Sequence, residues 1–454
     1  MRTAGKQIMW RIISIGLLLL AGGHVAAQGP AALDAQLRAR LEEMGLMPLA
    51  PPPPTDPALV ALGEALFFDR ILSGNRDTAC ATCHHPLLAT GDALSLSLGT
   101  GNSGLGPERQ HAPGRPFIPR NAPDIFDRGG PEWAVMFWDG RVIQTQAGDF
   151  ITPAGGQLPP GLTNALAAQA MFPVTSPAEM RGMPGDVDIF GQDNELALFD
   201  DEDYAGIWDA LMDRLRGVPG YVALFAAAYP DIPPQAWGFQ HAANAIAAYE
   251  AAVYTFTDSP WDRYLAGDDA ALSEEAIRGA LLFYGDGGCY RCHGGDLMTD
   301  QRFHNAAVPQ IGPGKQEEAP LDYGRGHETG RADERFAFRT PPLRNVALTG
   351  PWMHNGAYTS LGAAVRHMID PAAALRAYDG AEIDPELRTL LWNDPATIAA
   401  VLETLDPLLA TPPALTDADV DALLAFLMAL TDPAAVDMQA LIPTSVPGGL
   451  PVMD

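Results

Sequence analysis

Two copies of one motif, Cys-x-x-Cys-His, carry all four cysteines of the 454-residue chain. The copies are Cys80-Ala-Thr-Cys83-His84 and Cys289-Tyr-Arg-Cys292-His293. Two thiols at this spacing can form thioethers with the two vinyl groups of one haem, and the following histidine is placed to ligate the iron. A single Cys-x-x-Cys could equally belong to a zinc or thiol-redox site. Two copies, each followed by histidine, favour haem, so we predict two covalently bound haem c groups.

The elements that must position these motifs are also repeated. A helix is predicted from Asp56-Pro57, which form an N-cap and first-turn pair, to Phe68. A second helix is predicted to begin at Ser273, with acidic residues in its first turn. The sequences LGEALFF (62–68) and RGALLFY (278–284) share a glycine, a leucine and two aromatic positions, and each precedes one cysteine motif. This internal repeat predicts two units of one kind.

Each predicted unit also ends in an amphipathic helix, over 240–254 in the first and 417–430 in the second, with Thr416 as N-cap. No region shows strand periodicity. We therefore expect a mainly α-helical fold of two cytochrome c-like domains, over 55–262 and 263–432, each holding one haem. Residues 28–54, which include the Pro-rich stretch that begins at Pro48, are expected to be a linker, and residues 433–454 a tail over the surface.

Charge and targeting signals narrow the class of protein. The chain has 56 acidic and 28 basic residues, which argues against nucleic-acid binding and suits a basic partner. Residues 1–27 combine three basic residues, a ten-residue apolar run and a small-residue site ending at Ala27, as in a secretory signal peptide. The apolar run is about half of the ~20 residues that a membrane span needs. We therefore expect export to the periplasm, cleavage near Ala27 and no membrane span afterwards.

Beyond these motifs, residues 55–430 resemble the bacterial dihaem cytochrome c peroxidase family, including its MauG-like branch. The resemblance rests on LGEALFFDRILS (62–73), RNAPDIFD (120–127), FWDGR (137–141), the stretch 169–180 and FRTPPLRNVALTGPWMHNG (338–356). It implies that the haem of 55–262 reduces hydrogen peroxide and the haem of 263–432 delivers the electrons. It also implies a small electron-donor protein, either a c-type cytochrome or a cupredoxin. Because family members are often homodimers, it implies a homodimer here as well.

The same resemblance assigns the axial positions. Met368, fourteen residues after His354, matches the second ligand of the electron-transfer haem, where a thioether raises the potential. Met353 is the alternative ligand, and a buried core methionine is the alternative role for Met368. MauG-like enzymes have tyrosine at this position, so Met368 favours a peroxidase. The family's distal histidine, sixteen residues after the first proximal one, is replaced by Thr100. We expect an open iron there, with His111 as an unconventional alternative ligand.

Three residues are implied in the reaction itself. Glu179 matches the acid of the family's distal pocket, where it would move a proton between the two peroxide oxygens. Burial there should raise its pKa, although a capping or surface glutamate is the plain alternative. Gln169 matches a residue that orients peroxide or water. Trp138 matches a tryptophan between the two haems that couples them, and core packing is compatible with that role.

The remaining matches concern a cation and four other side chains. The resemblance implies calcium between the domains, bound by the Asn121 side chain and the carbonyls of Thr349 and Pro351, oxygen ligands that suit a hard cation. Asp139 and Arg141 are expected to bind haem propionates or each other, and His304 and His367 to be hydrogen-bonding groups. Two rival functions stay open: MauG-like oxidation of a partner protein's side chains, and electron carriage by two haems without catalysis.

Overall fold

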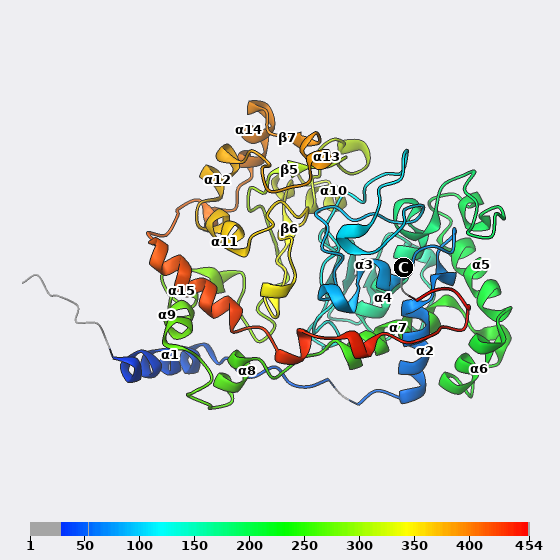
Figure 1. The fold of residues 1–454 in the computed structure, drawn as a ribbon, viewed down its shortest axis with the longest axis horizontal. Helices are drawn as coiled ribbons and strands as arrows, with labels where there is room; N and C mark the ends of the chain where they lie inside the picture. Colours follow the sequence, from blue (N-terminus) through cyan, green and yellow to red (C-terminus); the bar gives the residue numbers. More distant parts are fainter. Residues whose placement is uncertain (1–28, 53, 453–454) are drawn as a thin grey trace, which may run out of the picture.

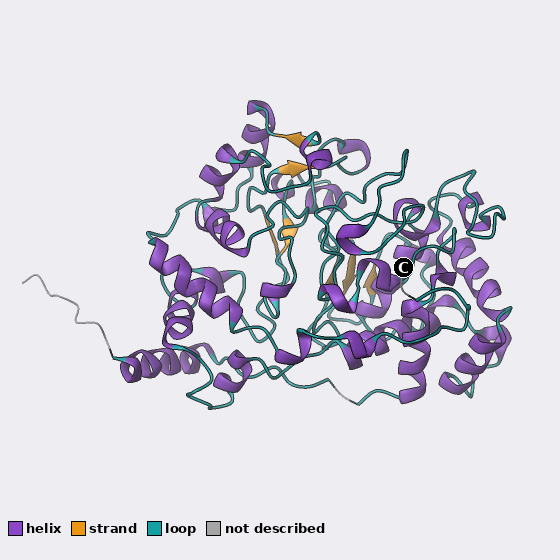
Figure 2. Cartoon of the chain, in the orientation of Figure 1, coloured by secondary structure: helices purple, strands orange, loops and turns teal. Residues whose placement is uncertain are grey.

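The computed structural model describes residues 29–52 and 54–452, so the predicted signal peptide over 1–27 lies outside the described residues. The described chain is mainly helical, and its strands are only two or three residues long (Figure 2). Strands this short leave no alternating pattern in the sequence, which is why none was predicted. None of the helices in these ranges has the length and apolar character needed to cross a membrane.

The helices fall into two groups, seen on the two sides of Figure 1. The first group comprises α2 (Pro57–Phe68), α3 (Cys80–Cys83), α4 (Ala165–Ala170), α5 (Tyr204–Arg216), α6 (Pro219–Ala228) and α7 (Phe239–Val253). Helix α8 (Pro260–Leu265) follows α7 and lies with the second group, where Trp261 and Tyr264 enter the second hydrophobic core (Figure 1). The second group also comprises α1 (Pro30–Met44), α9 (Glu274–Phe283), α10 (Arg325–Thr329), α11 (Leu361–Ile369), α12 (Pro371–Ala377), α13 (Pro385–Arg388), α14 (Pro395–Glu403) and α15 (Asp417–Met428).

Three small antiparallel sheets pin the loops between the helices. The order in the first sheet is β1 (Val135–Met136), β2 (Val142–Gln144) and β3 (Phe150–Ile151), with Val135 opposite Ile143 and Ile143 opposite Ile151. The other two sheets are pairs: β4 (Phe303–His304) with β6 (Phe338–Arg339), and β5 (Gln310–Ile311) with β7 (Leu391–Trp392). The first sheet supports the FWDGR loop between β1 and β2.

The sequence repeat corresponds to a repeated helix pair. In the first half α2 packs on α7, and in the second α9 packs on α15. A Cβ on Gly63 of α2 would lie 1.9 Å from the Ala245 carbonyl oxygen, and a Cβ on Gly279 of α9 would lie 1.9 Å from the Ala422 carbonyl oxygen. Each shared glycine is therefore required because two helix backbones touch there.

The aromatic positions of the repeat are equivalent as well. The ring centroids of Phe67 and Tyr249 lie 5.3 Å apart, and those of Phe283 and Phe426 lie 5.2 Å apart. All four rings are buried. The predicted helix starts are confirmed: the side chains of Asp56, Ser273 and Thr416 each accept a backbone N–H at the beginning of α2, α9 and α15.

The N-terminal segment corrects one prediction. Residues 28–54 were expected to be a Pro-rich linker, yet Pro30–Met44 form helix α1, which packs on α9 of the second half (Figure 1). Leu37 and Leu41 are buried in the second hydrophobic core, and the Arg38 guanidinium donates to the Tyr264 carbonyl at 2.6 Å. The linker prediction was wrong because it extended the Pro-rich character of the stretch from Pro48 onward to the residues before it. Those residues have leucines spaced four apart, a pattern typical of a helix.

The C-terminal tail makes the opposite crossing. After α15 the chain runs back along the first half and ends near α3 and α4 (Figure 1). Val446 and Leu450 are buried in the first hydrophobic core, and the Gly448 N–H donates to Asp69 at 2.7 Å. Each end of the described chain is thus packed on the half that is distant in sequence.

Candidate active site

The first cysteine motif borders a cavity. Cys80 and Cys83 begin and end α3, so both thiols lie on one helical turn, and His84 follows directly. All three side chains line a cavity of about 570 Å³, a size typical of small-molecule sites at roughly 300–1,000 Å³. The hydroxyl of Thr82 accepts the N–H of Ala79 at 2.9 Å and fixes the turn. None of the four cysteines is paired in a disulfide, so all four sulfurs are available for thioether bonds.

The His84 imidazole is held in one tautomer. Its Nδ1 lies 3.1 Å from the Thr90 carbonyl oxygen. Because a carbonyl oxygen only accepts, Nδ1 carries the proton and Nε2 keeps its lone pair. Burial lowers the pKa of His84, so the ring is neutral at pH 7. Neutral imidazole with a free Nε2 is the form that ligates iron.

The second motif has the same arrangement. The His293 N–H donates to the Cys289 carbonyl at 2.9 Å, as the His84 N–H donates to the Cys80 carbonyl at 2.9 Å. The Nδ1 of His293 donates to the Met298 carbonyl at 3.3 Å, and burial lowers the pKa of this ring to about 4. Both motifs therefore present two thiols and one neutral imidazole whose Nε2 is left for a metal.

The cavity wall carries the predicted acid and amide. Gln169 is the fifth residue of α4, whose N-cap Asn164 accepts the Ala167 N–H at 2.9 Å. Glu179 lies in a single π-helical turn over Pro177–Arg181, a conformation common at functional sites. Both side chains line the cavity. Burial raises the pKa of Glu179, and nearby Arg141 opposes that rise. A carboxyl group in this setting can both take and give a proton.

Thr100 and His111, the two other positions considered for an iron ligand, do not line this cavity. Thr100 is buried, and its hydroxyl donates to Asp77 at 2.7 Å. The backbone N–H of Thr100 donates to the Glu179 carbonyl at 2.8 Å, so this residue supports the π-helical turn. The two ring nitrogens of His111 bond to Glu386 at 2.9 Å and to the Arg115 carbonyl at 2.8 Å. Neither side chain is presented to the cavity.

Buried polar atoms test whether a haem fits the cavity. Nη1 of Arg128 and Oε2 of Glu250 are buried without a hydrogen-bond partner among the described residues, and both side chains line the cavity. Arg339 lines it too and is fully buried with only backbone carbonyls as hydrogen-bond acceptors. Two carboxylates such as haem propionates would supply the missing acceptors. Thiols, a neutral imidazole, the free Nη1 of Arg128 and the buried Arg339 together fit a covalently attached haem.

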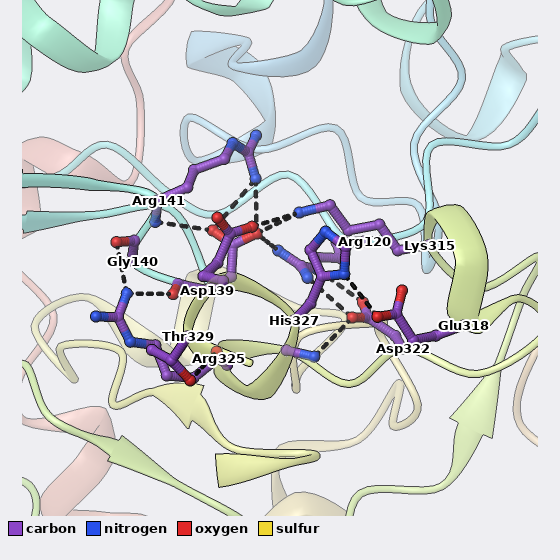
Figure 3. Close-up of polar contacts among 12 residues, drawn as sticks. Arg120, Asp139, Gly140, Arg141, Lys315, Glu318, Asp322, Arg325, His327 and Thr329 are labelled. Atoms are coloured by element: carbon purple, nitrogen blue, oxygen red, sulfur yellow. Dashed lines mark hydrogen bonds and ion pairs between the residues drawn. The ribbon is translucent and has the colours of Figure 1, made fainter. Parts of the chain in front are cut away.

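A buried ion network joins the halves beside the cavity (Figure 3). Asp139 is fully buried and accepts Arg120 Nη1 and Lys315 Nζ, each at 2.5 Å, and Arg141 Nη1 at 3.0 Å. The expected pairing of Asp139 with Arg141 is therefore confirmed. Arg120 also donates two hydrogen bonds to Asp322, at 2.7 and 2.9 Å. Despite burial, the three cations hold the pKa of Asp139 well below its usual range.

Trp138 stands where the two halves meet. Its indole is buried, lines the cavity of the first half and donates through Nε1 to the Asn121 carbonyl at 3.0 Å. Its own carbonyl accepts the N–H of Arg339, in β6 of the second half, at 2.8 Å. This junction suits the predicted role in coupling two haems, which stays a prediction.

The second-half candidates separate into a ligand candidate and structural histidines. Met368 lies half-buried near the end of α11, and its assignment as an iron ligand, like that of Met353, stays a prediction. His367 bonds to the Tyr358 hydroxyl and donates to the Ala306 carbonyl, both at 2.8 Å. His304 bonds to Asp406 at 2.6 Å and Asp300 at 3.0 Å. The prediction that these two histidines are hydrogen-bonding groups is confirmed.

The calcium ligands also stay a prediction, although one contact brings their segments together. The Asn121 N–H donates to the His354 carbonyl at 2.8 Å, which places Asn121 near the segment of Thr349 and Pro351. The Asn121 amide nitrogen donates to the Leu94 carbonyl at 2.8 Å. This hydrogen bond does not use the side-chain oxygen, which is the atom predicted to bind calcium. His354 itself is buried and stacked on Phe338 with centroids 3.5 Å apart, as a structural residue would be.

Several cavity residues were missed by sequence reasoning. They come from four separate stretches of the chain and share only their position on this wall: Arg128, Tyr204, Glu250, Lys315, His327 and Glu328. His327 is bonded through Nδ1 to Glu318 at 2.7 Å. The helical pattern around Glu250 predicts a helix there, but no neighbouring residue indicates that the Glu250 side chain faces the cavity. Such residues become visible only when the long-range contacts are known.

Comparison with known proteins assigns this architecture to a class, the dihaem peroxidases. Residues 57–270 match the model of the di-haem cytochrome c peroxidase family. The methylamine utilization protein MauG of Methylorubrum extorquens is 31% identical over 74% of this chain and 75% of its own length. The cytochrome c551 peroxidase of Pseudomonas aeruginosa is 31% identical over 68% and 70%. The chain belongs to the di-haem cytochrome c peroxidase family and is a cytochrome c peroxidase-type oxidoreductase.

Two further relatives agree with this assignment. The cytochrome-c peroxidase IdrP1 of Denitromonas iodatirespirans is 33% identical over 79% of this chain and 84% of its own length. Among solved structures, a MauG-like protein associated with microbial copper homeostasis is 26% identical, with a TM-score of 0.58 over 87% of this chain and 96% of that one. The chain is therefore similar to proteins named for both branches of the family.

Proposed function

We propose that the protein is a periplasmic, exported peroxidase that reduces hydrogen peroxide to two waters, consuming two protons and two electrons from a small redox protein. The observation that carries the proposal is the cavity beside Cys80, Cys83 and His84. Gln169 and Glu179 line it, whereas Thr100 is turned to Asp77 and offers no ligand. The arrangement leaves room for an oxidant between a metal-binding imidazole and a proton-transferring acid.

The residues that would hold the two haems are those of the two motifs, with Met368 as the second axial ligand in the second half. When bound, the haems supply the redox chemistry, one receiving electrons from the donor and the other binding peroxide. Arg128, through its free Nη1, and the buried Arg339 would hold propionates of the first haem. Calcium bound by Asn121, Thr349 and Pro351 would brace the junction of the halves.

Glu179 is proposed to move the proton that makes peroxide cleavage possible. Its carboxylate takes the proton from the oxygen nearest the imidazole side and returns it to the far oxygen, which leaves as water. Two protons from solvent and two electrons then convert the remaining oxygen to a second water. Gln169 donates or accepts a hydrogen bond that orients peroxide, and the raised pKa of Glu179 matches the donor and acceptor roles.

Electrons are proposed to enter at the Cys289/Cys292 motif, from a c-type cytochrome or a cupredoxin, and to pass by way of Trp138. Trp138 supports this path because its side chain lines the first cavity and its backbone bonds to Arg339 of the second half. A homodimer, common in the family, is proposed on the resemblance alone.

Replacing Glu179 tests the proposal. Glu179→Gln keeps the shape of the side chain but cannot exchange a proton, so we expect peroxidase turnover to fall by about 10²- to 10⁴-fold. Haem content should stay at two per chain, and the resting spectrum should keep a five-coordinate, high-spin component. The exposed Glu108→Gln is the matched control and should turn over normally. Near-normal turnover of Glu179→Gln would remove this residue from the mechanism.

A MauG-like oxidation of a partner protein is the second candidate, because Thr100 replaces the distal histidine and relatives named MauG match most of the chain. Peroxide-dependent cross-linking or oxidation of side chains in a partner, with poor turnover of cytochrome donors, would favour it over the peroxidase. If both haems were instead six-coordinate and inert to peroxide, the chain would be an electron carrier and both candidates would fail.

A further inference from the structure

A surface segment that carries both acidic residues and exposed apolar side chains adjoins the cavity. It has no part in the proposed reaction. Residues 183–203, between the π-helical turn and α5, contain eight acidic and no basic residues. The same stretch exposes four large apolar side chains: Val187 (53%), Ile189 (49%), Phe190 (64%) and Leu198 (78%). Single exposed apolar residues are ordinary, but several on one short segment mark an interaction site.

The apolar side chains are held outward by an ordered turn. Val187 and Asp193 form an antiparallel bridge, and the buried carboxylate of Asp188 accepts the N–H groups of Phe190 and Gln192, both at 2.9 Å. The Ile189 N–H donates to the Asn75 carbonyl at 3.0 Å. Because the turn's backbone groups are satisfied in this way, Phe190 is presented in one place and binding costs little ordering entropy.

Buried and half-buried arginines bind acidic residues of the segment and leave other acids at its rim without an ion pair. Arg76 forms ion pairs with Asp188, in the turn closed by the Val187–Asp193 bridge, at 3.1 Å and with Glu195, just after that turn, at 3.4 Å. Arg115 and Arg181 pair with Asp186 and Asp201 in the same way. Four exposed acids have no ion pair among the described residues: Asp193, Asp200, Glu202 and Asp203. The outer surface of the segment is therefore apolar at its tip and negative around it.

The charge decides between possible occupants. In a symmetric contact with a second copy, each negative rim would face another, and each chain carries a net charge of −28, so self-association is opposed. A basic protein meets an apolar tip and an attractive rim together, which is the pattern of a specific interface. We propose that residues 187–203 dock a basic partner protein whose lysines or arginines surround an exposed apolar patch.

The position of the segment links docking to the chemistry. Asp201 and Tyr204, at its C-terminal end, line the cavity beside the first cysteine motif. The Asn194 amide at its centre donates to the Arg181 carbonyl at 2.8 Å, at the end of the turn that carries Glu179. A protein bound here lies next to the peroxide cavity, on the first half, and not at the proposed electron entry in the second. The proposal concerns binding and does not depend on turnover.

Binding of a lysine-rich cytochrome c to the haem-loaded protein tests the inference. The same cytochrome with its lysines acetylated is the control probe. We expect titration calorimetry to detect a complex that weakens at least tenfold in Phe190→Ser/Leu198→Ser and in Asp193→Asn/Asp200→Asn/Glu202→Gln. Raised salt and acetylation should weaken it as well. Matched exposed sites elsewhere, in Leu408→Ser/Val436→Ser and Glu43→Gln/Asp213→Asn/Asp333→Asn, should leave the affinity within twofold.

Each contrary result has one meaning. Absence of binding, or unchanged affinity in both segment variants, overturns the proposal. If size-exclusion chromatography shows that Phe190→Ser/Leu198→Ser converts a dimer to a monomer, the occupant is a second copy and the proposal is wrong. Circular dichroism of the variants checks that the fold is kept. Glu179→Gln should bind as the wild type does, so loss of docking and loss of turnover are distinguished.

Discussion

Glu250 is the buried acid whose surroundings differ most from those of an ordinary surface carboxyl group. It lines the cavity from α7, as Arg128 does, and its Oε2 has no hydrogen-bond partner among the described residues. Burial raises the pKa of Glu250 to about 8, and Arg128 only partly opposes the rise. The group is therefore protonated at neutral pH and can donate to an acceptor placed in the cavity.

This protonation predicts a pH-dependent stability. Between about pH 4.5, the ordinary pKa, and about pH 8, the folded protein holds a proton that the unfolded chain releases. The unfolding free energy therefore falls as pH rises through this range. Glu250→Gln removes the titration, so its stability relative to wild type should increase toward pH 8 by up to about 5 kcal/mol.

Guanidinium unfolding of the haem-loaded proteins at pH 5, 6, 7 and 8 measures this difference. The exposed Glu108→Gln should show the wild-type pH slope. Parallel slopes for wild type and Glu250→Gln would contradict a protonated Glu250.

At the residue scale, the sequence predicts groups whose partners are local. The cysteines and histidines of each motif are recognisable because their spacing over five residues is what allows them to bind one haem. Glu250 and Lys315 were missed because their roles depend on contacts across more than a hundred residues: Lys315 reaches Asp139 from the other half. The roles of Met368 and Glu179 came from family resemblance, since a methionine or glutamate alone carries no such signal.

At the element scale, the two helix pairs depend on close backbone contact. A Cβ on Gly63 would lie 1.9 Å from the Ala245 carbonyl oxygen and 2.7 Å from the Tyr249 Cβ. Neither atom belongs to a flexible side-chain end, so α2 and α7 must separate to admit a methyl group. We expect Gly63→Ala to lower the unfolding free energy by about 1–3 kcal/mol or more.

Chemical unfolding checks this expectation, with Gly156→Ala as the matched control because a Cβ there meets nothing within 4 Å. Gly279→Ala, the equivalent position of α9, should destabilise the protein similarly. If Gly63→Ala were as stable as Gly156→Ala, the two helices would be less closely packed than the structure indicates.

Element prediction succeeded where the ends of helices are marked by side chains. Asp56, Ser273 and Thr416 each accept a backbone N–H, and short polar residues before an apolar run are visible in the sequence. It failed for α1, whose apolar face contacts α9 of the distant half. The short strands were missed because two or three residues cannot display an alternating pattern.

At the scale of the whole molecule, contacts between the two halves fix how they pack together, and the two chain ends and a buried ion network are among them. Helix α1 packs on the second half, the C-terminal tail packs on the first, and the ion network of Figure 3 spans the junction beside Trp138. In that network Arg120 contributes to both sides, since it bonds to Asp139 of the first half and Asp322 of the second. Although burial opposes ionisation, Arg120 lowers the pKa of Asp322 to about 2.

Removing Arg120, which also lines the cavity of the first motif, should therefore weaken the junction of the halves. Arg120→Gln leaves Asp322 buried without its ion-pair partner, and breaking such a pair costs about 3–5 kcal/mol.

An acid whose pKa is lowered by folding contributes its stability above the unfolded pKa and loses it as pH falls through the folded pKa. The deficit should thus be complete above about pH 4 and shrink as pH falls toward 2. Unfolding curves across this range measure it, and the exposed Arg331→Gln should unfold as the wild type does. A deficit that is small, or that does not change with pH, would mean that the Arg120–Asp322 ion pair contributes little to the stability of the junction.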